Sequence, residues 1–150
     1  MILNNHDKKE YPPMHTAEHI LNATMVQLFG CSRSFNAHIE RKKSKCDYHL
    51  NQELTQEDIS VIENQVNKII NLHLSVTCEL VNRQEVDDRV DLSKLPEDAS
   101  QTLRIVKVGD YDVCACIGDH VKNTSEIGQF KITTYSHKDG VLRLRFKLLE

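Results

Sequence analysis

The chain has 150 residues, 39% hydrophobic and 27% charged, with a formal net charge of −3 at pH 7. This balance is ordinary for a folded globular protein and excludes a disordered chain. No apolar run approaches the roughly 20 residues that a membrane-spanning helix needs. We therefore expect one domain over residues 1–150, with 1–13 as a loose N-terminal segment. The start of the chain lacks the basic-then-apolar order of a signal peptide, so we expect a cytoplasmic protein.

The cysteines and the basic residues bear on the kind of site and partner. Five cysteines, an odd number without an export signal, argue against a disulfide framework and leave reduced thiols as ligands. The negative net charge argues against a nucleic-acid partner, because phosphate binding draws on Lys and Arg. A basic cluster weakens that argument, although its simplest interpretation is a solvated turn. The cluster consists of Arg41, Lys42, Lys43 and Lys45.

The first predicted element is a helix from about His15 to Phe29. Pro12 and Pro13 stop any preceding structure and pre-set the backbone for a helix start, and Gly30 is a suitable C-terminal end. The helix is apolar around most of its circumference, so we expect most of it to be buried. The apolar residues are Ile20, Leu21, Ala23, Met25, Val26, Leu28 and Phe29.

A strand pair and a second helix follow. Residues 34–40 and 45–50 have the pattern of two short strands around the polar turn that contains the basic cluster. Thr55 and Asp58 form a capping-box-like start. Apolar residues then recur at helical spacing and predict an amphipathic helix to about Leu72. They are Ile59, Ile62, Val66, Ile69 and Ile70.

The second half of the chain has the pattern of strands and turns. The predicted strands are residues 74–80, 103–108, 112–116, 130–136 and 141–148, and a polar connection covers 87–100. Long helices separated by hairpins, without regular strand–helix alternation, indicate an α+β fold. We expect an antiparallel sheet of hairpins packed with two main helices.

Two histidines, His15 and His19, stand four residues apart in the stretch MHTAEH. A helix places residues at this spacing on one face, so both imidazoles can point at one metal ion. The pattern is weak by itself. Eight histidines make a chance pair, on the surface or in the core, the simpler interpretation.

A second pair lies about a hundred residues later, in CACIGDH. Cys116 and His120 are separated by three residues at the end of a predicted strand, which would hold both side chains in place. A thiolate and three neutral imidazoles form the borderline-soft donor set that suits Zn²⁺. Cys114 competes with Cys116, but it lies two residues further back, and we interpret it as a small buried residue.

These motifs resemble the paired HxxxH and CxxxH signature of the alanyl-tRNA synthetase editing-domain family. The family includes free-standing AlaX-type proteins, and a related domain occurs in threonyl-tRNA synthetase. HTAEHILNATMVQLFG resembles its first helix, HIERKKSKCDYHL the next strand pair, and VGDYDVCACIGDHVKNTSEIGQFKI the segment with the second ligand pair. The chain departs from the family pattern at Ile117 and Asp119, which replace Gly and Thr, and at Ser125, which replaces Gly.

The resemblance implies one zinc ion held by His15, His19, Cys116 and His120. It also implies a zinc-dependent hydrolase that deacylates mischarged tRNA in trans, removing serine or glycine from alanine tRNA. Zinc can acidify a bound water or polarise a carbonyl. Four protein ligands, however, are typical of a structural site. The alternative is therefore a non-catalytic, zinc-stabilised module that binds tRNA or another protein.

Two residues beside the ligands are candidates for catalysis. Asp119 places a carboxylate next to His120, where it could orient the imidazole or act on water, but a turn residue is an equally good interpretation. Thr16 is a candidate pocket hydroxyl. Glu18 lies between the helical ligands, and we expect it to be exposed, because its side chain points about 100° away from that of His19.

Substrate and RNA contacts have weaker signals. Asn123, Thr124 and Arg143 are candidates for substrate binding, although Asn123 and Thr124 would equally suit a cap or a turn. The basic cluster is the candidate for phosphate contacts with the acceptor end of tRNA. Its members are Arg41, Lys42, Lys43 and Lys45.

Overall fold

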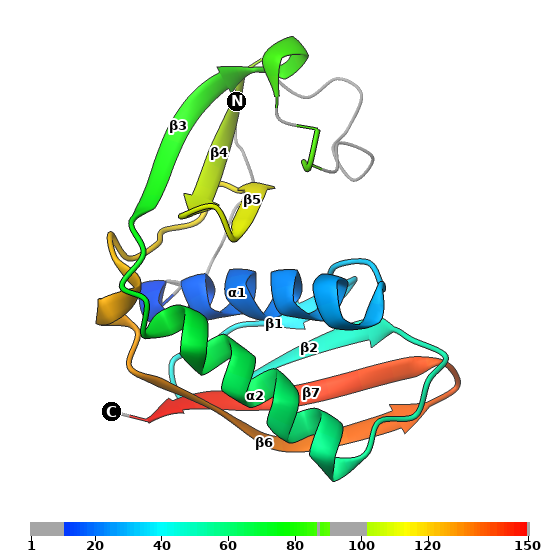
Figure 1. Cartoon of the computed structure of the whole chain (residues 1–150). Coiled ribbons are helices and arrows are strands. Elements are labelled where there is room, and N and C mark those ends of the chain that lie inside the picture. Colours follow the sequence, from blue (N-terminus) through cyan, green and yellow to red (C-terminus); the bar gives the residue numbers. More distant parts are fainter. Residues whose placement is uncertain (1–10, 87, 91–101, 150) are drawn as a thin grey trace.

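The computed structural model describes residues 11–86, 88–90 and 102–149. Two helices and two antiparallel sheets make up the fold, which confirms the α+β prediction (Figure 1). Most of the predicted loose segment, residues 1–10, lies outside the described residues, whereas residues 11–13 form the start of the first helix. None of the described helices is long and apolar enough to cross a membrane.

Helix α1 (Pro12–Phe29) begins at Pro12 and not at the predicted His15. Prolines fit the first helical turn, where a backbone N–H would have no partner inside the helix. The helix ends, as predicted, at Gly30, which adopts the left-handed conformation with φ of 68°. Its first part is buried, but the last turn emerges from the core, so that Val26 and Leu28 are 39% and 42% exposed. The prediction that these two residues are buried is wrong.

The larger sheet has four strands in the order β1-β2-β7-β6. They are β1 (Asn36–His38), β2 (Ser44–His49), β7 (Val141–Leu149) and β6 (Gln129–Lys138). Alternate residues of β7 (Leu142, Leu144 and Phe146) are fully buried on the face that packs against the helices. Helix α2 (Gln56–Ile70) starts with the predicted capping box and covers the same face beside α1 (Figure 1).

The remaining strands form a second sheet of three strands in the order β3-β4-β5. They are β3 (Val76–Asn82), β4 (Thr102–Val108) and β5 (Asp112–Ala115). Helix α1 lies between the two sheets (Figure 1). The prediction of one sheet is corrected to two, because a helix buried around most of its circumference needs a layer on each side. Short 3₁₀ turns η1 (Arg83–Glu85) and η2 (Thr124–Glu126) follow β3 and precede β6.

Strand β3 is the edge of the smaller sheet, and its alternating residues are not buried as the pattern predicts. Cys78 is exposed and Leu80 is 74% exposed. Helix α1 packs against β4 and β5, so the described residues do not cover this part of β3. Of the predicted connection 87–100, only residues 88–90 are described, and Val90 packs in a small cluster with Leu103.

Candidate metal centre

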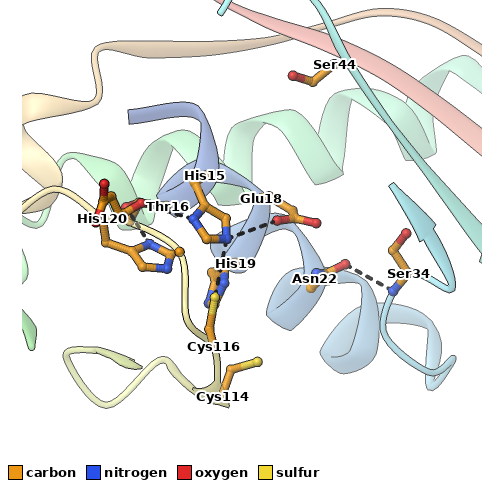
Figure 2. A network of polar contacts seen from close by, with 12 residues as sticks. His15, Thr16, Glu18, His19, Asn22, Ser34, Ser44, Cys114, Cys116 and His120 are labelled. Carbon is orange, nitrogen blue, oxygen red and sulfur yellow. Dashed lines mark hydrogen bonds and ion pairs between the residues drawn. The ribbon is translucent and has the colours of Figure 1, made fainter. Parts of the chain in front are cut away.

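Four side chains from two distant parts of the chain meet between α1 and the end of β5 (Figure 2). The first turns of α1 present His15 and His19 on one face. Cys116 directly follows β5, and His120 lies in the loop that leads to η2. One ligand atom from each of the four side chains lies within 4.8 Å of every other. This proximity is the condition that the predicted ligand set requires.

Hydrogen bonding orients the imidazole of His15. Its Nδ1 lies 3.0 Å from the backbone carbonyl of Asp119. A carbonyl can only accept, so Nδ1 carries the proton and Nε2 presents a lone pair. That Nε2 faces Cys116 Sγ at 3.4 Å. The ring is therefore held in the tautomer that a metal ligand needs.

His120 is oriented by a hydroxyl group of α1. Thr16 Oγ1 lies 2.9 Å from His120 Nδ1 and accepts a hydrogen bond of 3.2 Å from the backbone N–H of Val121. The Nε2 atom of His120 is buried and has no hydrogen-bond partner among the described residues. A buried nitrogen without a partner is costly in a folded protein unless a ligand uses its lone pair.

The third imidazole, His19, faces a buried carboxylate. Its Nδ1 lies 3.3 Å from Asp112 Oδ2, within ion-pair distance but without the alignment of a hydrogen bond. Arg33 holds the same carboxylate in a bidentate pair, with nitrogen–oxygen distances of 2.6 and 3.2 Å. The carboxylate favours a proton on Nδ1 and so leaves Nε2 of His19 for a metal ion. A carboxylate behind a ligating histidine is a common arrangement at zinc sites.

The electrostatics keep the imidazoles of His19 and His120 neutral, as metal binding requires. Burial lowers the pKa of His19 to about 4, although the Asp112 carboxylate opposes the shift. Burial lowers the pKa of His120 to about 2, and the neighbouring imidazoles lower it further. Three imidazoles and one thiol, with a buried His120 Nε2 that lacks a partner among the described residues, fit a zinc ion.

The chain is similar to domains of known aminoacyl-tRNA synthetases. The family described as "Threonyl and Alanyl tRNA synthetase second additional domain" matches residues 103–145, which include Cys116 and His120. The chain is 36% identical over 137 residues to the alanine–tRNA ligase of Aeropyrum pernix. It is 32% identical over 151 residues to that of Methanococcus vannielii. The chain belongs to the alanyl-tRNA synthetase editing-domain family.

These matches cover 88% and 96% of this chain but only 15% and 17% of the two ligases. A third relative, the alanine–tRNA ligase of Fervidobacterium nodosum, is 35% identical over 123 residues, with 81% of this chain and 14% of that protein covered. The chain thus corresponds to one part of much longer enzymes, and their activity as whole proteins does not transfer to it.

In this member of the editing-domain family, Arg104 fixes the loop that carries the second ligand pair. Its Nη1 donates to the carbonyl oxygens of Cys116 and Gly118, at 3.1 and 2.6 Å. The residues predicted for the site did not include Arg104, Asp112 or Arg33. A signal existed only for Asp112, which strand alternation places on the same face as Cys116.

The positions of the acidic residues Asp119 and Glu18 differ from those expected. The Asp119 side chain is exposed, and the described contact of this residue is its backbone carbonyl, which binds His15 and not His120. Glu18 was expected to be exposed, which is wrong. Its side chain is 15% exposed, and Oε1 lies 3.7 Å from His15 Nε2. Both faces of α1 are covered near its start, so a residue between the ligands is also enclosed.

Asn123 and Thr124 have structural contacts. Asn123 caps η2 and donates to the carbonyl of His73. Thr124 is fully buried, donates to the carbonyl of Ile70 and accepts from the N–H of Leu74. Both residues join the loop after α2 to η2, which corresponds to the cap-and-turn interpretation.

Arg143 is not brought to the metal centre. It alternates with the buried residues of β7 and therefore points to the outer face of the larger sheet. There it forms a bidentate pair with Asp47 of β2, at 2.7 and 2.9 Å. Its predicted role in substrate binding has no geometric support.

The depressed pKa values predict an acid-sensitive apo protein. In the unfolded chain His19 titrates near 6.5, and in the folded chain near 4. Between these values the unfolded state binds more protons, so stability falls as the pH falls. For the chelator-treated protein we expect a loss of about 2 kcal/mol between pH 7 and pH 5 from His19 alone, with His120 acting in the same direction. Urea unfolding at pH 7 and at pH 5 measures this loss of stability. An unchanged free energy of unfolding would contradict the prediction.

Proposed function

We propose that this domain is a zinc-dependent deacylase that removes serine or glycine from mischarged alanine tRNA. The observation that carries the proposal is the convergence of His15, His19, Cys116 and His120, with each imidazole oriented by a separate partner. Membership of the editing-domain family supports the same substrate class. We further propose that the domain acts in trans, on tRNA charged elsewhere in the cytoplasm.

The protein's own residues prepare the site. The carbonyl of Asp119 holds His15 in the tautomer that presents the Nε2 lone pair, and the Thr16 hydroxyl fixes the orientation of the His120 ring. Thr16 already contacts His120 and Val121, so we assign it a positioning role. Bound zinc would polarise the ester carbonyl or lower the pKa of a water molecule. Of the carboxylates, we propose Glu18 for proton transfer in place of the Asp119 side chain, since Glu18 lies beside His15.

Deacylation assays test this function directly. The purified protein, loaded with zinc, should release serine from seryl-tRNA(Ala) and glycine from glycyl-tRNA(Ala), while alanyl-tRNA(Ala) persists. His15→Ala should abolish the release, because one ligand and the contact to Asp119 are lost together. Circular dichroism establishes that the variant is folded. Equal release by both proteins would refute the proposed function.

A closed set of four protein ligands favours a second candidate, a non-catalytic zinc-stabilised module that binds tRNA or protein. Chelation separates the two. A structural zinc would hold the fold, so that its removal unfolds the domain. We expect the fold to persist instead, because the main core joins α1, α2 and the larger sheet, and of the four ligands only Cys116 packs against it. Loss of turnover with a retained circular dichroism spectrum would favour the deacylase.

A further inference from the structure

Basic side chains form two cross-strand pairs on the outer face of the larger sheet. Lys45 of β2 lies opposite Arg145 of β7, and Lys131 of β6 lies opposite Lys147 of β7. Directly opposed residues of antiparallel strands point to the same side. Their neighbours Leu144 and Phe146 are fully buried on the other side, against the helices. The four cations, Lys45, Lys131, Arg145 and Lys147, are named here the outer cation group.

The described residues form no ion pair with this group, although Lys45 and the Asp47 carboxylate attract each other over a longer distance. The adjacent acid Asp47 is already held in a bidentate pair by Arg143. Among the described residues, no ion pair joins an acidic side chain to any member of the outer cation group. Like charges placed directly opposite each other destabilise a sheet. Two such pairs, in a protein with a net charge of −3, point to an anionic partner that offsets the repulsion.

The outer cation group lies at the same end of the molecule as the metal centre. Lys45 follows the loop of Arg41, Lys42 and Lys43, and the Arg41 guanidinium stacks 5.3 Å from the ring of Tyr11. Tyr11 is the residue directly before α1, and its carbonyl accepts from the N–H of the ligand His15. β7 ends at this side as well (Figure 1). The loop of Arg41, Lys42 and Lys43, which leads into Lys45, therefore lies near the start of α1.

We propose that the outer cation group binds the phosphate backbone of an RNA duplex, the acceptor stem of the tRNA whose 3′ end enters the metal centre. This assignment of the partner rests on the proposed function. Side chains of one strand recur about 7 Å apart on one face, and opposed pairs about 5 Å apart. The four cations thus lie close together on one face of the sheet, which suits the closely spaced phosphates of a helical backbone. Such contacts position a nucleic acid without reading its bases.

Salt-dependent binding tests the inference. The probe is an RNA hairpin with the acceptor stem of alanine tRNA and no attached amino acid. Its binding is measured by fluorescence anisotropy over a series of KCl concentrations. Lys131→Gln/Lys147→Gln and Lys45→Gln/Arg145→Gln should each weaken binding about tenfold and reduce the slope of log Kd against log salt by about 2. The matched control, Lys68→Gln/Lys107→Gln, removes the same charge from α2 and β4 and should change neither quantity.

Two results would overturn the inference. In the first, the slope of log Kd against log salt is unchanged in both variants of the outer cation group, while their melting temperatures match that of the wild type. In the second, polyglutamate binds the wild-type protein more tightly than the hairpin does. The second result would indicate an acidic protein as the partner. The hairpin carries no amino acid, so the result is independent of hydrolysis. If the hairpin binds as expected but no serine is released in the deacylation assay, the proposed function fails, whereas the binding of RNA phosphates by the outer cation group stands.

Discussion

Replacing Cys116 by alanine should lower the zinc affinity of this protein by at least about 100-fold. A structural zinc site with four ligands contributes about 10 to 16 kcal/mol, on the order of 3 kcal/mol for each ligand. Cys116 supplies the only thiolate of the four ligands, and its Sγ atom lies 3.4 Å from the Nε2 atom of His15. Competition with a chromophoric chelator measures the affinity, and metal analysis of the purified protein gives the stoichiometry.

Cys114→Ala is the matched control for this measurement. Cys114 lies two residues earlier on β5 and does not belong to the group of four whose ligand atoms lie close together. Both substitutions remove one sulfur atom and leave alanine. General effects of the substitution on this part of the chain are therefore the same in the two variants. Zinc affinity should stay within a few-fold of the wild type. A loss as large as that of Cys116→Ala would exclude the proposed ligand assignment.

The second large effect is expected for Asp112→Asn. The substitution preserves shape but removes the charge that faces His19 and pairs with Arg33. Zinc affinity should fall about 10- to 100-fold, the usual cost of removing a group that orients a ligand. The unfolding free energy should also fall by on the order of 3 kcal/mol, since the Arg33 charge loses its partner in a largely enclosed position.

Asp47→Asn separates the two effects of Asp112→Asn. Asp47 forms the same kind of bidentate pair, with Arg143, on the outer face of the larger sheet, away from the ligands. The Arg143 side chain holds the pKa of Asp47 below its usual value, so the pair is charged at neutral pH. Urea unfolding should report a lower stability, with zinc affinity unchanged. If both variants lowered zinc affinity equally, the effect would come from general destabilisation and not from His19.

Local geometry explains which features the sequence predicted. The spacing of His15 and His19 places both on one face as soon as α1 forms, because 3.6 residues complete a helical turn. The capping box at Thr55 and the end of α1 at Gly30 follow from neighbouring residues in the same way. Short turns join β4 to β5 and β6 to β7, so the antiparallel pairing of these strands could also be predicted from the sequence.

The tertiary structure alone decided how these parts meet. Thr16 and His120 are 104 residues apart, and their hydrogen bond depends on the packing of β5 against α1. No periodicity connects Arg33 with Asp112, or Arg104 with the carbonyl of Gly118. The division into two sheets, the enclosure of Glu18 and the outward direction of Arg143 depend equally on which surfaces cover each other. A repeat along the chain determines the face on which a side chain lies, but what that face contacts is set by the free energy of packing the whole domain.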